Sequence, residues 1–136
     1  MLLILMLLFS NVAMAGDSVG VDVGFGLGSK PSYGADYQFN FDSVFNKGNP
    51  YVDVMVMANS EYVQPYLSTG LTFDHINVGF GITTFIWPDS SSFAMGPECG
   101  YTQNLNKDLY VKESNYLLGF DGKYNFSLQL SIGLNL

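Results

Sequence analysis

The last thirteen residues, Tyr124 to Leu136, constrain the fold more than any other stretch, because they alternate strictly between two kinds of side chain. Even-numbered positions are apolar, and odd-numbered positions are small or polar and uncharged. Successive side chains of a strand point to opposite faces, whereas a helix would scatter a period-two pattern around its circumference. The stretch exceeds the usual strand length and suffices to cross a bilayer at a tilt, which takes about 9–11 residues. Such a strand should not remain an open edge, so we expect it to close a β-barrel.

Composition narrows the possible functions. The chain has five lysines, no arginine and twelve acidic residues, which give a net charge of −7. Nucleic-acid binding needs clustered basic side chains on phosphates, so we expect no nucleic-acid partner. Cys99 is the single cysteine, which excludes an internal disulfide. We interpret Cys99 as a small apolar residue on a strand.

The first fifteen residues have the features of a cleavable signal peptide. Leu2 to Phe9 is an apolar run, Ser10-Asn11 is a polar break, and Ala13-Met14-Ala15 supplies a small-x-small cleavage pattern. The apolar run is too short to span a bilayer as a helix, which takes about 20 residues. We therefore expect residues 1–15 to be removed on export and residues 16–136 to form one domain.

Seven further segments of the mature chain have strand-like patterns, and turn-forming residues or polar connections separate them. Together with the last stretch, the predicted strands cover residues 19–27, 33–41, 51–58, 62–73, 76–86, 93–101, 109–120 and 124–136. The predicted connections at 42–49, 87–92 and 102–108 are the longer ones, and Asn59-Ser60, Asp74-His75 and Asp121-Gly122 are short turns. This pattern predicts an all-β domain without helices after residue 15.

Two kinds of irregularity interrupt the pattern. Pro65 and Pro97 fall within predicted strands, although a proline cannot donate to a strand ladder. In the segment 109–120, the apolar run that begins at Tyr116 does not share the phase of Leu109 and Val111. We therefore expect a β-bulge near Ser114-Asn115, or a later start of this strand.

The two faces of these strands indicate which side meets lipid. One face carries Val, Leu, Ile and Phe, whereas the other carries Gly, Asn, Gln, Ser and Asp. Charged residues form only 12% of the chain, which is too little to cover the outside of a soluble domain. We therefore predict an eight-stranded antiparallel up-and-down transmembrane β-barrel, with its apolar face toward lipid. Five aromatic residues at strand ends would suit the interfacial girdles: Tyr33, Tyr51, Tyr62, Trp87 and Tyr124.

With these strands, the chain resembles the small eight-stranded outer-membrane proteins of Gram-negative bacteria, the OmpA/OmpX-like barrels. Pro65-Tyr66-Leu67-Ser68-Thr69-Gly70-Leu71 is similar to the P-Y-x-x-x-G-L strand common among them. The chain departs from them in its last residue, Leu136, where an aromatic is usual, and in a lumen without arginine. The resemblance implies a place in the bacterial outer membrane, contact with its lipid and lipopolysaccharide, insertion by the barrel-assembly machinery, and a monomer.

Polar residues on the predicted inner face are the candidate site. They are Asp22, Asp36, Gln38, Asp53, Gln64, Glu98 and Gln129. An eight-stranded barrel has an interior just wide enough for side chains to fill, so a packed polar lumen with water is the simplest interpretation. A proton or cation site is the alternative, because several carboxylates with few lysines should not all stay ionised. A narrow, cation-preferring pore follows from that alternative.

The single histidine raises an enzymatic alternative. Some small barrels are lipid A deacylases with a His-x-Ser pair and a nearby glutamate, and here the triplet is His75-Ile76-Asn77, without the nucleophilic serine. Ser68 or Glu98 would have to lie near His75 for a hydrolase site, and we interpret His75 as a solvated turn residue instead. No metal cluster or phosphate-binding loop is found, so no cofactor is expected. We predict a non-enzymatic protein with a structural or surface-interaction role in the cell envelope, and keep a lipid-modifying hydrolase as the alternative.

Overall fold

The computed structural model describes residues 16–26, 30–42, 48–120 and 122–136. The predicted signal peptide, most of the predicted 42–49 connection and Asp121 of the predicted last hairpin lie outside these ranges. Within them, no helix has the length and apolar character needed to cross a membrane.

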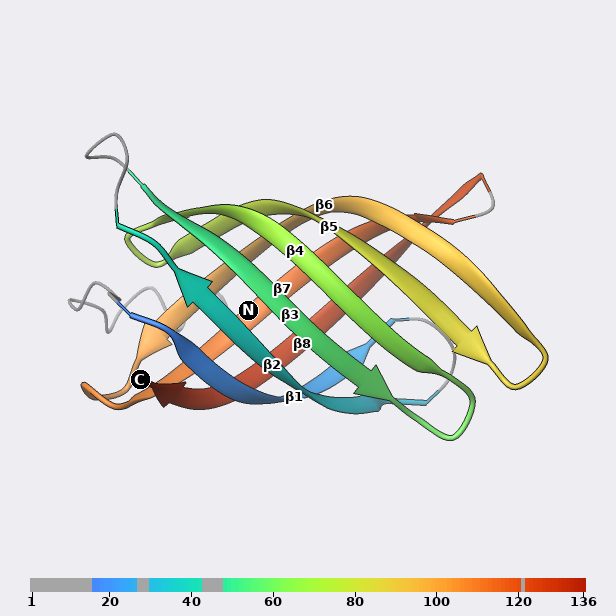
Figure 1. Cartoon of the computed structure of the whole chain (residues 1–136), viewed down its shortest axis with the longest axis horizontal. Coiled ribbons are helices and arrows are strands. Elements are labelled where there is room, and N and C mark those ends of the chain that lie inside the picture. Colours follow the sequence, from blue (N-terminus) through green and yellow to red (C-terminus); the bar gives the residue numbers. More distant parts are fainter. Residues whose placement is uncertain (1–15, 27–29, 43–47, 121) are drawn as a thin grey trace.

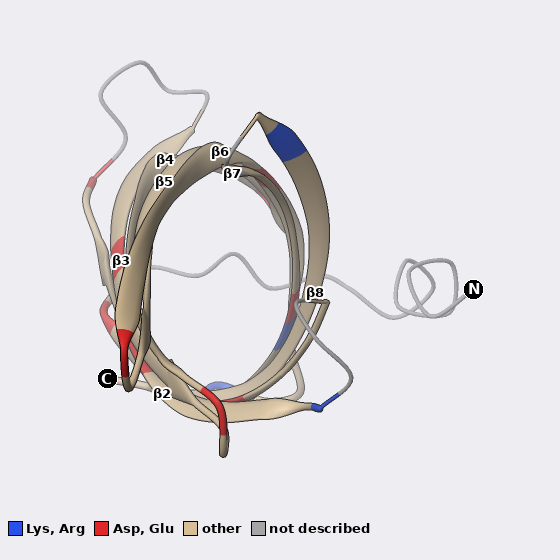
Figure 2. Ribbon diagram, turned by 90° about the vertical axis from the view of Figure 1, so that its right-hand side faces the viewer, with Lys and Arg blue, Asp and Glu red and all other residues tan. Residues whose placement is uncertain are grey.

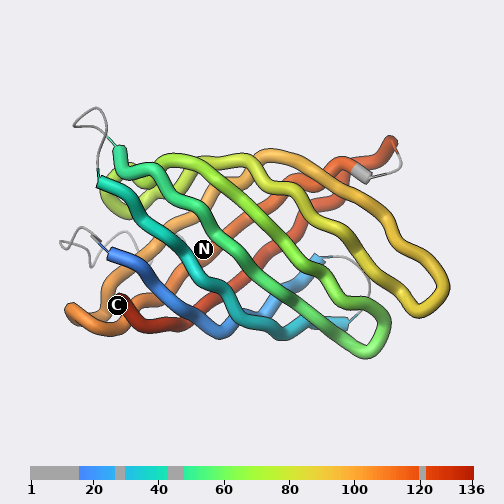
Figure 3. Tube along the Cα trace, in the orientation of Figure 1, coloured from blue at the N-terminus to red at the C-terminus, as the bar shows by residue number. Residues whose placement is uncertain are grey.

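The described residues form eight strands, joined in chain order into a closed antiparallel barrel (Figures 1 and 3). The strands are β1 Ser18–Phe25, β2 Ser32–Asn40, β3 Asn49–Ala58, β4 Val63–Phe73, β5 Ile76–Trp87, β6 Ser90–Asn104, β7 Leu109–Phe120 and β8 Lys123–Asn135. The predicted fold class is therefore confirmed. The alternating stretch at the end of the sequence is β8, and it pairs with β7 on one side and β1 on the other.

Closure leaves both ends of the described chain at one end of the barrel. β1 and β8 pair from Ser18 with Asn135 to Phe25 with Leu128. The Leu136 N–H donates to the Asp17 carbonyl at 2.8 Å, which extends this seam to the last residue. We call this the terminal end, and the ends of β2, β4 and β6 also lie there. We call the opposite end, where β1, β3, β5 and β7 end, the hairpin end.

The two faces of the wall follow the alternation in the sequence. Val54 and Val56 of β3 point outward and are about half exposed, whereas Asp53, Met55 and Met57 between them are buried. Figure 2 shows the barrel along its axis as a ring, and residues other than Asp, Glu, Lys and Arg make up most of its wall. The wall therefore has an apolar outside and a filled, largely polar inside.

The hairpin between β5 and β6 is tighter than the sequence pattern suggests. The predicted 87–92 loop is wrong in extent, because only Pro88 and Asp89 separate the two strands. Ladder pairs reach Trp87 with Ser90, because serines are tolerated at the exposed end of a strand. β6 also extends past its predicted end, to Asn104.

Pro65 and Pro97 do not end their strands. Each leaves a gap in the ladder on one side only: Pro65 pairs with β3 but not β5, and Pro97 pairs with β5 but not β7. The register is the same on both sides of each gap. Both side chains point outward, where the missing N–H removes one ladder hydrogen bond without changing the faces of the strand.

The predicted bulge in β7 is wrong. The β7–β8 register runs without a shift from Leu109 with Leu134 to Phe120 with Lys123. Leu109, Val111 and Leu117 therefore share the outward face, and Tyr116 and Leu118 point inward. The apparent change of phase arises because the intervening outward residues are Glu113 and Asn115, which are polar. No extra residue is inserted.

The aromatic residues at the strand ends divide into two groups. Tyr33 and Tyr124 are strongly exposed on the outer wall, as an interfacial girdle requires. Tyr51 and Tyr62 are instead buried inside the barrel, and Trp87 packs against Tyr62 with ring centroids 6.1 Å apart. The girdle assignment of these last three residues is therefore wrong. Gly70 and Gly79 leave room for the hydroxyl of Tyr51, and Tyr62 and Trp87 pack with Phe85 in a cluster of inward rings.

Candidate functional site

The seven polar residues expected in the lumen all occupy inward positions of the register. Asp22, Asp36, Gln38, Asp53, Glu98 and Gln129 are buried, and Gln64 is partly buried and lines an internal cavity near the hairpin end. They come from β1, β2, β3, β4, β6 and β8. The barrel brings most of them together through two sets of contacts.

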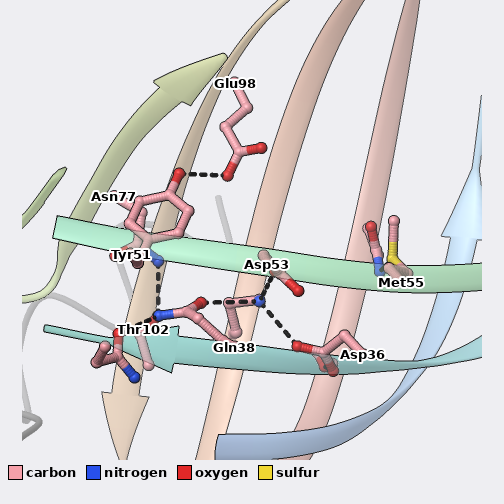
Figure 4. A network of polar contacts seen from close by, with 12 residues as sticks. Asp36, Gln38, Tyr51, Asp53, Met55, Asn77, Glu98 and Thr102 are labelled. Atoms are coloured by element: carbon pink, nitrogen blue, oxygen red, sulfur yellow. Dashed lines mark hydrogen bonds and ion pairs between the residues drawn. The ribbon is translucent and has the colours of Figure 1, made fainter. Parts of the chain in front are cut away.

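The first set of contacts centres on Lys112, a residue that the sequence did not place. Its ammonium donates to Asp53 Oδ2 at 2.8 Å, Asp36 Oδ2 at 3.1 Å and Gln38 Oε1 at 3.3 Å. Asp36, Gln38 and Asp53 converge on this point from β2 and β3 (Figure 4). Ser131 Oγ on β8 donates to the other oxygen of Asp36 at 3.2 Å. Lys112 from β7 therefore neutralises two buried carboxylates across the lumen.

Glu98 forms the second set of contacts. The hydroxyl of Tyr51 donates to Glu98 Oε1 at 2.6 Å, and that of Tyr66 donates to Oε2 at 3.1 Å. Both oxygens of this buried carboxylate are thus satisfied by neutral donors, and Figure 4 shows the Tyr51 ring reaching it across the lumen. Tyrosine hydroxyls here replace the arginine that the lumen lacks.

Inward glycines make the room for these tyrosines. A Cβ atom added at Gly79 would collide with the hydroxyl of Tyr51, and one at Gly81 with that of Tyr66. The glycine-rich faces of the sequence are therefore the sites where inward rings from other strands fit. This relation between distant residues is not visible in any single strand.

An apolar layer fills the lumen toward the hairpin end. Its buried members are Met55, Met57, Tyr62, Tyr66, Phe85, Ala94, Tyr116 and Leu118. The Tyr66 and Tyr116 rings meet edge to face at 4.8 Å. A cavity beside this layer measures about 10 Å³, space for about one water molecule. The lumen is closed by side chains at this level.

Five buried acidic or hydroxyl residues have an oxygen without a hydrogen-bond partner among the described residues. They are Asp22, for both of its oxygens, and Asp53, Ser68, Tyr110 and Glu113, for one oxygen each. Asp22 points to the same inner face, but it is not among the residues to which Lys112 donates a hydrogen bond. Among the described residues, no group of three or more His, Cys, Asp or Glu side chains could hold a metal ion.

His75 lies in the β4–β5 turn as expected, but the prediction that it is solvated is wrong. Its side chain is buried against the ring of Tyr101 and interacts through Nδ1 with the Thr102 carbonyl at 3.1 Å. Its other nitrogen lies 3.4 Å from Asp74 Oδ1. Thr102, which pairs with this turn, is four residues from Glu98 along β6, about 13 Å. Glu98 is already bonded to two tyrosines, so the described residues contain no His–Ser–Glu arrangement.

From the filled lumen we predict how the protein behaves in ion-conductance recordings. We expect the folded protein to give no stepwise conductance in planar bilayers, because ions would have to cross the apolar layer and then the Lys112 contacts. Addition of protein-free detergent is the control for the recordings. Reproducible steps that scale with protein concentration would contradict the closed lumen and favour the pore.

Comparison with known proteins agrees with this architecture. No family model and no curated protein matches the sequence. The structure is similar to the N-terminal β-barrel domain of Pseudomonas aeruginosa OprF, with a TM-score of 0.50 over 89% of this chain and 98% of that one, at 12% identity. A weaker similarity, with a TM-score of 0.31 and 14% identity, covers 90% of this chain and all of Ail, the attachment invasion locus protein of Yersinia pestis. The chain therefore has the fold of the small eight-stranded barrels that its sequence resembles, the OmpA/OmpX-like barrels.

Proposed function

We propose that this chain is a non-enzymatic barrel of the bacterial outer membrane, with a structural or surface-interaction role in the envelope. The observation that carries the proposal is the inverted distribution of polarity, with exposed Val, Leu, Ile and Phe outside and buried acids, amides and lysine inside. A soluble barrel would have the opposite arrangement. In lipid, every backbone polar group must be satisfied internally, and a closed barrel does this without an edge.

In the orientation proposed here, the terminal end lies in the periplasm and the hairpin end of an exported chain lies at the cell surface. The β3–β4 and β5–β6 connections there are only four and two residues long. Such short loops favour a compact envelope barrel whose main partners are outer-membrane lipid and lipopolysaccharide. Export by the leader at 1–15 and insertion by the barrel-assembly machinery are part of the same proposal.

The hydrolase alternative has little support in the site. Ser68 Oγ has no hydrogen-bond partner among the described residues, so no base is seen to activate it. Glu98 is held by tyrosines, and His75 is bonded to a backbone carbonyl at the terminal end. These residues occupy different parts of the barrel and do not form a nucleophile–base pair.

Membrane fractionation tests the proposal directly. We expect the expressed protein in the outer-membrane fraction, with electrophoretic mobility that changes on boiling because the folded barrel resists detergent. Expression of residues 16–136 without the leader is the matched control and should leave the protein in the cytoplasm. Recovery of the full chain as a soluble periplasmic protein, unshifted by boiling, would refute the membrane assignment.

A further inference from the structure

The buried charges on the inner face of the described strands do not balance. Four carboxylates and one ammonium lie there, an excess of three negative charges when all are ionised: Asp22, Asp36, Asp53, Glu98 and Lys112. Lys112 contacts Asp36 and Asp53, and two tyrosine hydroxyls donate to Glu98. Asp22 is only 3% exposed, and neither of its oxygens has a hydrogen-bond partner within the described ranges. Asp22 is therefore the acid that lacks a compensating group.

Two paired glycines form a bare floor close to Asp22. In one cross-strand row, Gly20 of β1 is paired with Gly133 of β8. Asp36 of β2 flanks Gly20 in this row, and Tyr110 of β7 flanks Gly133. Because the glycines have no side chains, the carboxylate of Asp36 and the phenol of Tyr110 can reach over them from opposite sides.

Three oxygen atoms converge over Gly20. A Cβ atom added there would collide with Asp36 Oδ1, and it would lie 2.6 Å from the hydroxyl oxygen of Tyr110 and 2.7 Å from Ser131 Oγ. Tyr110 is 1% exposed, yet its hydroxyl has no hydrogen-bond partner among the residues that the structure describes. Asp22 lies in the next row, where it is paired with Ser131. Two carboxylates and two hydroxyls thus lie together on one part of the inner face.

The neighbouring side-chain amide does not serve Asp22. Gln129 lies one row further along β8, where it is paired with Gly24. Its Nε2 contacts the sulfur of Met55 and lies 3.9 Å from that of Met57. A water molecule could donate to Asp22 but would leave the charge of the carboxylate uncompensated, which is costly in an interior. A cation compensates the charge and takes oxygen ligands at the same time.

We propose that Asp22, Asp36, Tyr110 and Ser131 form a binding site for a sodium ion inside the barrel. Ser131 Oγ donates its proton to Asp36 at 3.2 Å, so its lone pairs are available to the ion. The Lys112 ammonium already holds the other oxygen of Asp36 at 3.1 Å, which favours one further positive charge over two. The site lies in the lumen, so this proposal does not depend on the cellular location proposed above.

The position of the site suits binding rather than passage. Gly20 and Tyr110 lie near the beginning of β1 and β7, and Ser131 lies near the end of β8, so the site is on the side of the terminal end. The apolar layer fills the lumen toward the hairpin end. An ion that enters from the terminal end would therefore be held and not conducted.

Sodium NMR measures this binding, because the resonance of a quadrupolar ion broadens when a slowly tumbling protein holds it. The full chain is refolded in an uncharged detergent, and sodium chloride replaces choline chloride at constant ionic strength. We expect saturable broadening with the wild type. Asp22→Asn keeps the size of the side chain and removes its charge, and it should weaken binding about tenfold or more. Tyr110→Phe removes one hydroxyl ligand and should weaken binding to a smaller extent.

Asp89→Asn is the matched control, because it makes the same change at an exposed acid between β5 and β6. It should bind sodium as the wild type does. Denaturant midpoints give a second measurement, since an ion that binds only the folded state raises the midpoint. The wild-type midpoint should rise with sodium but not with choline, and Asp22→Asn should lose this response. A boiling-dependent mobility shift checks that each variant folds, and Tyr110→Phe remains a test if Asp22→Asn does not.

Several results would overturn the proposal. They are the absence of saturable broadening, broadening that neither Asp22→Asn nor Tyr110→Phe weakens, and an equal loss of binding in Asp89→Asn. A wild type that ignores sodium and gains stability from Asp22→Asn would show that Asp22 holds a proton instead of an ion. Binding of calcium without binding of sodium, measured in the same way, would also contradict it. Fractionation judges the membrane proposal separately, so either proposal can fail while the other stands.

Discussion

Replacement of Lys112 by methionine is expected to lower the free energy of unfolding by about 3–5 kcal/mol. The lysine is almost fully buried and bridges Asp36 and Asp53 at 3.1 and 2.8 Å. Methionine fills a similar volume but leaves two carboxylates in the lumen without a counter-charge. Denaturant unfolding in detergent micelles, followed by the fluorescence of Trp87, measures the loss.

A compensating variant separates charge from packing. Lys112→Met combined with Asp36→Asn and Asp53→Asn removes the uncompensated charges and should recover most of the lost stability. Lys123→Met is the matched control, because Lys123 is exposed at the hairpin end and should change stability little. A Lys112→Met midpoint equal to that of the wild type would show that the Lys112 contacts do not stabilise the barrel.

Replacement of Leu67 by arginine is expected to cost about 2–4 kcal/mol, the usual penalty for a cation at the lipid-facing midplane of a barrel. Leu67 lies near the middle of β4, points outward and is 45% exposed. Leu67→Trp should be close to neutral, because lipid yields around a larger apolar side chain. The same substitution in a filled core would cost about 1–3 kcal/mol through overpacking. Denaturant midpoints after refolding in micelles compare the two variants, and equal damage would place Leu67 in an interior.

The same substitution at Leu130 should be less damaging. Leu130 also points outward, but its cross-strand partner on β7 is Glu113. An arginine there can pair with this carboxylate, as opposite charges on neighbouring strands do. We therefore expect Leu130→Arg to retain a higher midpoint than Leu67→Arg, and Leu130→Arg in a Glu113→Leu background to lose that advantage. Equal losses at both positions would contradict the outward placement of Glu113.

Together, the closed lumen and the apolar wall favour a role that depends on the outside of the barrel. The Lys112 contacts, the Tyr51 and Tyr66 bonds to Glu98 and the apolar layer occupy the interior. What remains accessible is the apolar outer wall and the short connections at the hairpin end.

The sequence alone was enough to predict the order of the strands, their closure into a barrel, and which side chains of a strand point outward or inward. Alternation is a local property with a period of two, so the outward Val54 and the inward Asp53 could be assigned from their neighbours along one strand. The same local evidence predicted polar residues in the lumen and hairpins at most turns. This local evidence was misleading in β7. There the polar residues Glu113 and Asn115 occupy outward positions, so the alternation seems to shift by one residue although the register does not.

Only the tertiary structure decided which of these residues meet. Lys112 contacts Asp36 and Asp53 across 76 and 59 residues of sequence, and no local pattern could pair them. Tyr51 was expected at the membrane interface but turns inward, because Gly70 and Gly79 on other strands leave room for its hydroxyl. The contacts of an inward side chain depend on the register between strands and on the volume that residues distant in the sequence leave free. Alternation along a strand determines the face of a residue, whereas barrel closure determines its partner.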